Sequence, residues 1–391
     1  MRRGSGWLAA LLAVSLAACS PRAPQRTVVE FWQPFEAARY DSLVARFERE
    51  NPSLSVHVRE VSAADMRDTL AAALANRIVP DLCVLDSTVL PSLLESGQLS
   101  DWSAGVADLR DSLSGWEPCR VGDAIYGMPG LLDTRVLFYD ERAFERAGLD
   151  PAEALADWDA IERTVARLGK SLRVPGWGLA RDQVYAASWP CVRATGEPDS
   201  LLAAHGVPGA IGLQRLVRIR HVARVASQDS LELAFVRGEL PLLLAGPRLA
   251  SRLGAASHAP RWSAVVLPAA NSPSVAAGAS AALASFTRSA HKEGALRFAR
   301  HLVSPASAQE AAARFPEWLP SSRESWPVCA ATPALAAQPY WTAFGPASAR
   351  DVRDRQIWTR ELTAALFGEL DARVAMAAIA AALDSTGADA P

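Results

Sequence analysis

The sequence predicts an α/β protein with two lobes, extended hinge strands and a ligand cleft between the lobes. Residues 28–97 follow a strand-helix-strand-helix-strand order, which is typical of a parallel sheet covered by helices on both faces. The same order returns from residue 138 onward. Between the two units lies a short polar island, Asp133-Thr134-Arg135, set between two apolar strands. We interpret this island as the pivot between the lobes, with its polar side chains facing the cleft.

The first unit is predicted from alternating apolar patterns. Short apolar runs predict strands at 28–32, 54–58 and 82–85, and helical spacing predicts helices at 37–49, at 64–75 and in a segment that ends at Gly97. In parallel sheets, ligands bind beyond the carboxyl ends of the strands. Those ends carry residues 33–36 and Asp86-Ser87, so the sequence predicts a site there.

The second unit repeats these patterns and is followed by a helical carboxyl-terminal segment. The predicted helices are 141–147, capped by Gly148, then 152–168 and 213–225, and the predicted strands are 177–180, 240–245 and 262–268. Residues 275–286 are small and apolar, residues 291–302 form an amphipathic helix, and the chain is helical from about residue 352 to about residue 383.

The size and charge of the chain limit its classes of function. A length of 391 residues suggests two domains or one large two-lobed unit. Half of the residues are hydrophobic, which is enough to build packed cores. The net charge of −2 gives no argument for a nucleic-acid surface, so we expect no nucleic-acid partner.

The first residues of the chain have the pattern of an export signal. Arg2-Arg3 precede a 12-residue apolar stretch that is too short to span a bilayer. This stretch ends in Leu-Ala-Ala-Cys19, which resembles a bacterial lipobox, in which the cysteine thiol is lipidated after cleavage. Residues 1–19 are therefore a predicted lipoprotein signal peptide, and residues 20–26 a tether. We expect a protein on the periplasmic or extracellular face of the cell envelope, anchored by lipid through Cys19, with the choice of membrane left open.

The remaining reactive side chains show no pattern of an enzyme or a metal site. The spacing of Cys83, Cys119, Cys191 and Cys329 fits no zinc motif; Cys83 is expected to be a buried thiol, and a Cys119–Cys191 disulfide is left open. The chain lacks a Gly-x-Ser-x-Gly elbow, a His-Glu-x-x-His motif and a glycine-rich phosphate loop. We therefore predict no catalytic residue, no cofactor and no metal, with a secreted hydrolase as a less favoured alternative.

An ordered series of short motifs carries a family resemblance. They are Phe31-Trp32, Pro80-Asp81 to Asp86, Tyr126-Gly-Met-Pro, Asp133-Thr-Arg-Val-Leu-Phe-Tyr139, Ala147-Gly-Leu, Ala245-Gly246-Pro247 and Ser304-Pro305-Ala-Ser-Ala-Gln309. From about residue 27 to residue 384 the chain resembles the extracellular solute-binding proteins of ABC importers, in their maltose-binding-like, sugar-binding branch (family 1).

The resemblance implies a periplasmic-binding-protein-like fold in which the chain crosses between lobes three times. The crossings would fall near Asp133, near Pro268 to Ser274 and near Pro316 to Ser322. The amino-terminal lobe would comprise 27–133 plus 272–316, and the carboxyl-terminal lobe 138–268 plus 322–391.

The implied function is substrate capture for an ABC transporter. A monomer would bind a mono- or oligosaccharide in the cleft and deliver it to the transmembrane subunits of a permease. The alternatives are a binding protein for an anionic or non-sugar solute, or a receptor that serves a sensor kinase.

Candidate ligand-binding residues in the amino-terminal half have structural alternatives. The resemblance places Asp86 on the ligand, but it could instead cap the helix that starts near Val89. Phe35 and Glu36 lie in the first strand-end loop, which could simply be solvated. Asp133 and Arg135 face the predicted cleft, although they could form a salt bridge with each other.

In the second half the resemblance supplies most of the candidates. Tyr185 and Trp189 fall where the family has aromatic residues, and they could instead be core residues. Gly278 matches a position where the backbone approaches a sugar, and Trp318 and Arg323 flank a pocket edge at Leu319-Pro320.

One position departs from the family pattern. After Gly246-Pro247 many relatives have a tryptophan that stacks on the sugar, and this chain has Arg248. An arginine can stack on a ring or bind a carboxylate or phosphate through two hydrogen bonds. The substitution leaves an anionic ligand open, and Arg248 could also be a surface residue of the following helix.

Overall fold

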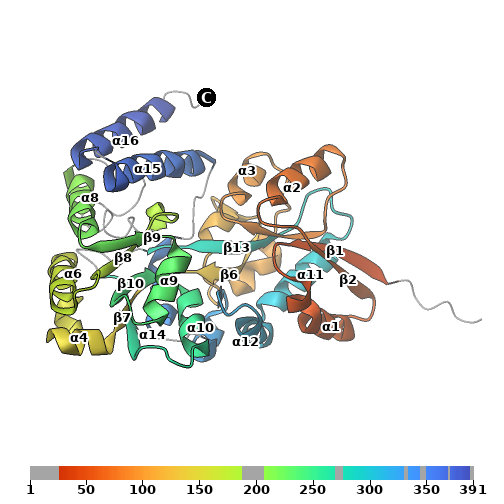
Figure 1. The fold of residues 1–391 in the computed structure, drawn as a ribbon. Coiled ribbons are helices and arrows are strands. Elements are labelled where there is room, and N and C mark those ends of the chain that lie inside the picture. Colours follow the sequence, from red (N-terminus) through yellow and green to blue (C-terminus); the bar gives the residue numbers. More distant parts are fainter. Residues whose placement is uncertain are drawn as a thin grey trace, which may run out of the picture.

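The structure is a computed structural model that describes residues 26–186, 207–268, 276–329, 333–343, 349–368 and 370–387. Cys19, Trp189 and Cys191 lie outside the described residues, as does the side chain of Cys329. Two lobes lie side by side, each built on a β-sheet with helices packed against it (Figure 1). The predicted two-lobed α/β fold is confirmed.

The first lobe is built on a six-stranded sheet of order β14-β6-β13-β3-β1-β2. Its strands are β1 (Thr27–Gln33), β2 (Leu54–Glu60), β3 (Leu82–Asp86), β6 (Met128–Asp133), β13 (Ala279–Ala284) and β14 (Leu319–Pro320). β1 is parallel to β2 and β3, but β13 is antiparallel to both of its neighbours, and β14 is antiparallel to β6. The predicted parallel arrangement of the first three strands is confirmed, and the complete sheet is mixed, because the chain returns in the opposite direction as β13 and β14 after passing through the second lobe.

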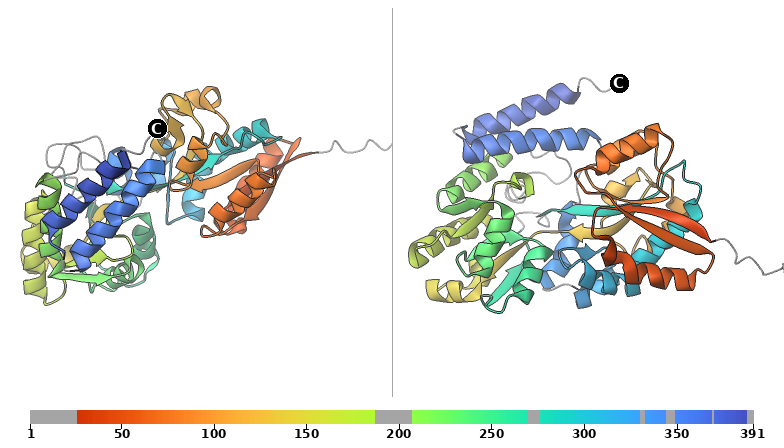
Figure 2. Two further views of the ribbon diagram at one scale, coloured as in Figure 1. Left: turned by 90° about the horizontal axis from the view of Figure 1, so that it is seen from above. Right: turned by 45° about the vertical axis from the view of Figure 1, so that its right-hand side comes forward.

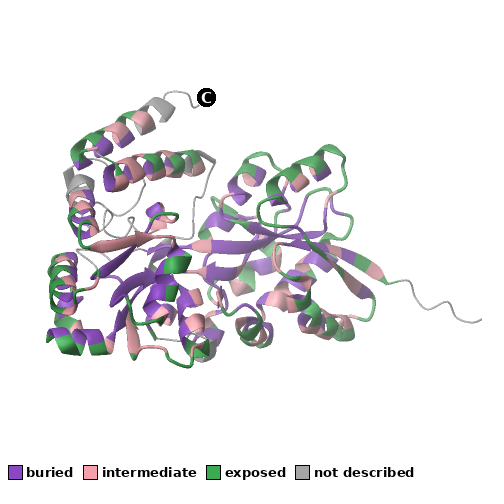
Figure 3. Cartoon of the chain, in the orientation of Figure 1, coloured by how far each residue is buried: buried purple, intermediate pink, exposed green. Residues whose placement is uncertain are grey.

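Helices pack on both faces of the first sheet (Figure 2). They are α1 (Asp41–Glu50), α2 (Met66–Ala75), α3 (Leu90–Glu95), α11 (Lys292–Val303) and α12 (Pro305–Arg314), with the 3-10 turns η1 (Ala37–Tyr40), η2 (Ser103–Leu109) and η3 (Glu117–Cys119) and the hairpin β4 (Arg120–Val121) and β5 (Ala124–Ile125). Adjacent strand residues point to opposite faces. Accordingly, Phe31 belongs to one buried cluster and Trp32 to another. Figure 3 shows the central strands of this sheet mostly buried between helices whose outer faces are exposed, whereas the edge strand β2 is only partly buried.

The second lobe is built on a five-stranded sheet of order β11-β7-β10-β8-β9. Its strands are β7 (Val136–Asp140), β8 (Trp177–Ala180), β9 (Ala223–Ala226), β10 (Leu242–Ala245) and β11 (Trp262–Val265). Its helical segments are α4 (Glu141–Ala147), α5 (Pro151–Ala154), α6 (Trp158–Leu172), α8 (Val207–Arg220), α9 (Gln228–Val236), α10 (Pro247–Ala255), α13 (Trp326–Cys329), α14 (Pro333–Ala337), η6 (Gln338–Trp341), α15 (Ala349–Phe367) and α16 (Ala372–Gly387). Trp177 and Trp358 are fully buried in the core of this lobe. The 3-10 turn η5 (Arg323–Ser325) packs against the first lobe, where Arg323 bonds to Ser114 and Asp111.

Two helix predictions in the second lobe need correction. The segment 152–168 is two helices, because the carboxylate of Asp157 accepts the backbone N–H of Ala160 and starts α6 as a new helix. The predicted helix 213–225 ends at Arg220, and Ala223–Ala226 form β9, paired in parallel with β8. The predicted helical carboxyl-terminal segment is confirmed and consists of two helices, α15 and α16.

The chain passes from one sheet to the other within two residues. β6 ends at Asp133 in the first sheet, and β7 begins at Val136 in the second. The Thr134 hydroxyl lies 2.7 Å from the Thr342 hydroxyl of β15 (Thr342–Ala343). β15 pairs with β12 (Ala276–Ala277), and β12 is followed in the chain by β13. Strands from three distant parts of the sequence therefore meet at the junction of the lobes.

No helix among the described residues is long and apolar enough to cross a membrane.

Candidate ligand-binding site

Strand register brings several predicted residues to one end of the first sheet, which forms an edge where β3 and β6 terminate. Asp86 is the last residue of β3 and pairs with Ala281 of β13. Two residues earlier on β13, Ala279 pairs with Asp133, the last residue of β6. Gly278 directly precedes Ala279 and is buried. These positions lie at the edge that faces the second lobe, as the strand-end argument predicts.

Asp86 is exposed and supports the turn that leads into α3. Its Oδ1 atom accepts the backbone N–H of Thr88 at 2.6 Å and that of Val89 at 3.2 Å. These bonds close the turn before α3 but do not cap the helix itself, whose N-cap residue is Val89 and which has no side-chain cap. A role in ligand binding remains a prediction, which the exposure of the carboxylate permits.

A cluster of aromatic rings forms at the same edge. The ring of Phe35 contacts Phe315 edge-on, with centroids 5.1 Å apart, and Trp318 at 6.0 Å. Phe35 and Trp318 are half-buried, so part of each ring remains accessible. Arg39 lies over the Phe315 ring and also pairs with Glu317. A partly accessible aromatic surface of this kind can pack against the C–H face of a sugar ring.

Glu36 lies beside this cluster and points into solvent. Its side chain is 78% exposed, and its nearest ion-pair contact is Arg39 Nε at 3.9 Å. The alternative of a solvated loop therefore describes Glu36 but does not describe Phe35.

The polar island at the crossover is an internally bonded unit. Arg135 forms a salt bridge with Asp133 and donates a 3.0 Å hydrogen bond to the Gln183 side chain in the second lobe. Both charged side chains are mostly buried, with 12% of Arg135 and 21% of Asp133 exposed. The structural alternative of a mutual salt bridge is confirmed, and ligand contact by either residue remains a prediction.

Arg248 lies on the first turn of α10, at the carboxyl end of β10, and pairs with an acid. Its Nη2 atom donates a 3.1 Å hydrogen bond to Glu232 of α9, and its Nε atom lies 2.9 Å from the other carboxylate oxygen as an ion pair. Burial lowers the pKa of Arg248, but the hydrogen bond to Glu232 and the charges of Glu232, Asp229 and Asp133 outweigh burial and raise the pKa above its usual value.

The other predicted residues have protein partners. The Arg355 guanidinium lies 4.6 Å from the ring centroid of Tyr185, which packs against the core of the second lobe. Arg323 donates to the Ser114 hydroxyl and to the Asp111 carbonyl, at 2.9 and 3.2 Å. Trp189 lies outside the described residues.

Three further residues shape the candidate site, and two of them escaped prediction from the sequence. Gln33 ends β1, is fully buried and accepts the Phe35 N–H, while its Nε2 atom has no partner among the described residues. Gln183 and Glu232 hold the two candidate arginines. The strand-end rule pointed to Gln33, which begins the predicted loop, but no local sequence signal marks the other two.

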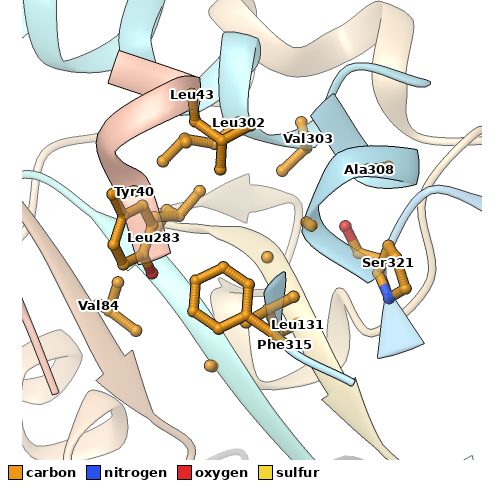
Figure 4. A pocket seen from close by; sticks show the side chains of 14 residues that line it. Tyr40, Leu43, Val84, Leu131, Leu283, Leu302, Val303, Ala308, Phe315 and Ser321 are labelled. Carbon is orange, nitrogen blue, oxygen red and sulfur yellow. The ribbon is translucent and has the colours of Figure 1, made fainter. Parts of the chain in front are cut away.

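Two hollows lie away from these residues. The first is a cavity of about 30 Å³ inside the first lobe, lined mainly by apolar side chains such as Leu43, Leu131 and Phe315 (Figure 4). This volume is close to that of one water molecule and cannot hold a sugar. The second is a groove of about 540 Å³ lined by Arg142, Arg237 and other residues at the opposite end of the second sheet. Neither hollow includes a predicted site residue.

Comparison with known proteins identifies the family. Residues 42–337 match the family described as bacterial extracellular solute-binding protein. The chain belongs to this family. Over 190 residues, this solute-binding protein is 27% identical to a Streptomyces antibioticus protein named as an uncharacterized lipoprotein in the oleD 5′ region. That match covers 46% of the chain and spans only 40% of the length of the relative.

Solved structures of solute-binding proteins share the fold over almost the whole chain. The sugar-binding protein MalE from Xanthomonas citri has a TM-score of 0.80 at 21% identity, covering 93% of this chain and 98% of that protein. The GacH receptor of Streptomyces glaucescens, studied with acarbose, has a TM-score of 0.76 at 17% identity, covering 94% and 100%. UgpB from Mycobacterium tuberculosis, in complex with glycerophosphocholine, has a TM-score of 0.75 at 18% identity, covering 91% and 97%. At these identities the likeness establishes the fold.

Proposed function

We propose that this protein is the substrate-binding component of an ABC importer, and that it captures a mono- or oligosaccharide between its lobes for delivery to a membrane permease. The observation that carries the proposal is the gathering of Asp86, Asp133 and the Phe35–Trp318 aromatic pair at the sheet edge that faces the second lobe. Accessible rings and strand-end carboxylates are the groups that bind the C–H faces and hydroxyl pairs of sugars. The named ligands of several structural relatives, maltose, acarbose and tagatose, support this class.

The proposed site includes all of the predicted positions. They are Phe35, Glu36, Asp86, Asp133, Arg135, Tyr185, Trp189, Arg248, Gly278, Trp318 and Arg323. We propose the lobe boundaries 27–133 plus 272–316 and 138–268 plus 322–391, with bending at the crossovers. Closure would create a second surface state for the permease to recognise.

A thermal-shift screen over neutral mono- and oligosaccharides tests the proposal. A ligand present at 100 times its Kd stabilises the folded state by about 2.7 kcal/mol, which is readily measured as a rise in Tm. A saccharide that raises Tm and also reduces the radius of gyration in solution scattering would support capture by closure. Stabilisation by amino acids or polyamines alone would overturn the carbohydrate class, and turnover of a glycoside panel would show an enzyme instead.

The alternative of a non-sugar solute rests on one structural relative. UgpB was solved with glycerophosphocholine, so this fold also holds phosphodiester ligands. Glycerophosphocholine should therefore be included in the thermal-shift screen, as a test ligand for the alternative class of non-sugar solutes. If solute binds but a permease does not respond, a sensor-kinase partner becomes the better explanation.

We also propose that the mature protein is a monomer anchored in the envelope through lipidated Cys19. The lipobox supports the anchor, and the name of the Streptomyces relative agrees with it. Detergent phase partitioning of the full chain and of Cys19→Ala would test it. The full chain should enter the detergent phase, and the variant should remain in the aqueous phase.

A further inference from the structure

Arg248 is the basic residue placed where a ligand would meet the second lobe. It follows the carboxyl end of β10 by three residues, and its side chain is 39% exposed. The preceding Gly246 packs against Asp133 and Arg135 at the crossover. A free guanidinium here would attract the carboxylate or phosphate of an anionic ligand.

The guanidinium is already surrounded by carboxylate oxygens. Its Nε atom lies 2.9 Å from Oε2 of Glu232, and Nη2 lies 3.1 Å from Oε1 of the same carboxylate. The remaining nitrogen, Nη1, lies 3.7 Å from Oδ1 of Asp229. Each of the three nitrogens therefore has a carboxylate oxygen within ion-pair distance, and the contact of Nη2 with Oε1 is a hydrogen bond.

Glu232 is held in place by more than Arg248. Its side chain is 2% exposed, and Gln228 donates a 3.2 Å hydrogen bond to Oε1. Nη1 of Arg252 lies 3.3 Å from Oε2. Removing one partner from a buried ion pair is strongly unfavourable, because the other charge is left buried and uncompensated. An anionic ligand would have to take Arg248 away from this acid.

The neighbouring charges also disfavour an anion. Arg248 and Arg252 are balanced by Asp229 and Glu232, and Arg135 is balanced by Asp133. On the first lobe, the loops at the strand ends carry the exposed carboxylates of Asp86 and Glu36, and Arg39 there is paired with Glu317. The candidate site therefore has no surplus positive charge among these described residues.

We propose that Glu232 is a specificity-determining residue, which occupies Arg248 as an internal anion and thereby makes the site selective for neutral ligands over uronates and sugar phosphates. This inference rests on the proposed function, because it assigns a ligand class to the same site. In this proposal, the arginine that stands at position 248 where many relatives have tryptophan helps the protein to reject charged ligands and does not recognise an acidic sugar.

The experiment frees Arg248 with Glu232→Gln, which keeps the shape of the side chain and removes its charge. Binding of glucose, glucuronate, galactose, galacturonate and sulfate is measured by calorimetry at low ionic strength for the wild type, E232Q and the double variant Glu232→Gln with Arg248→Met. We expect E232Q to bind at least one of the anions at least tenfold more tightly than the wild type, a change of about 1.4 kcal/mol, and the double variant to lose this gain. Glu239→Gln is the matched control, since Glu239 forms an exposed pair with Arg224 on the same lobe.

The outcomes separate this inference from the proposed function. Equal or tighter binding of an anion than of its neutral partner by the wild type would overturn the inference, and this comparison needs no variant. An unchanged anion affinity in folded E232Q, or a gain that survives in the double variant, would also overturn it. The comparison of sulfate binding by the wild type and the variants tests the role of Glu232 even if no sugar binds. Failure of every neutral saccharide to bind in the wider screen would count against the proposed function alone.

Discussion

Gly246 offers a direct test of how tightly the crossover is packed. A Cβ atom built on this residue would lie 2.6 Å from the Thr134 carbonyl oxygen and 2.5 Å from Oδ1 of Asp133, and it would also meet the Arg135 guanidinium. Real Cβ contacts essentially never fall below 3.0 Å. The backbone of Gly246 has φ −115° and ψ −163°, which an alanine can adopt, so the cost arises from packing alone.

Gly246→Ala should therefore destabilise the protein. Relief of the clash must displace the Thr134 backbone or break the Asp133–Arg135 pair, and overpacking of this kind costs roughly 1–3 kcal/mol. The smaller conformational entropy of unfolded alanine offsets about 0.4–1 kcal/mol of that cost. We expect a net loss of about 1–2 kcal/mol in urea unfolding followed by tryptophan fluorescence.

Gly254→Ala is the matched control. It lies in the same helix, α10, and a Cβ atom there would meet nothing within 4 Å. Alanine should stabilise this position by about 0.5–1 kcal/mol, because glycine is a poor helix former. If G246A proves as stable as the wild type, or is stabilised like G254A, the close approach of β10 to the crossover is not present in solution and the reasoning fails.

Three further predictions concern the first lobe. Iodoacetamide should leave Cys83 and Cys119 unmodified in the native protein at pH 8, because both thiols are buried and burial raises their pKa. Both cysteines should react in urea, and mass spectrometry that finds either of them labelled in the native protein would contradict the prediction. Burial, and secondarily the charge of Arg46, hold the pKa of His301 below its usual 6.5 despite the opposing charges of Glu50 and Glu310. The unfolded state therefore binds more protons than the folded state, so the free energy of unfolding should fall as the pH drops through about 6.5. His301→Gln should make the free energy of unfolding in urea less dependent on pH between about pH 5 and 7, and an unchanged dependence would refute the assignment. Trp318→Ala should weaken binding of any saccharide found in the screen by roughly tenfold, and Trp318→Phe should restore most of the affinity, whereas equal affinity for all three proteins would exclude the aromatic cluster from the site.

Local patterns predicted most of the fold, because local chemistry determines those elements. The helix α4 is bounded by Asp140, which accepts the backbone N–H groups of the first turn, and by Gly148 at φ 62°, a conformation that favours glycine. By contrast, β9 is a four-residue edge strand of half-buried residues with no alternation of polar and apolar side chains. It is a strand because β8 lies beside it, and such pairing cannot be read from a local pattern.

Part of the candidate site could likewise be predicted from the sequence, and part depends on tertiary packing. The strand-end rule located Asp86 and the residues after β1 because it depends only on strand direction. The contact between Phe35 and Trp318 requires β14 to join the first sheet, and the pairing of Glu232 with Arg248 requires α9 to pack on α10. No helix was predicted around Glu232, and only the packing of α9 on α10 brings its carboxylate to an arginine.

The crossover also indicates how binding and movement are divided between the lobes. Asp133 and Arg135 satisfy each other, Gln183 holds the arginine, and Thr134 bonds to Thr342, so the polar groups of the island are bound to protein before any ligand arrives. A polar island between two buried strands is stable for this reason, because unpaired buried groups would cost about 1–3 kcal/mol each. If a ligand binds here, we expect its contacts to come mainly from groups left accessible, which in the first lobe include Asp86, Glu36 and the faces of Phe35 and Trp318. We therefore expect substitution of these accessible first-lobe groups to change affinity with little effect on folding, and substitution of Gly246 to change the stability of the crossover.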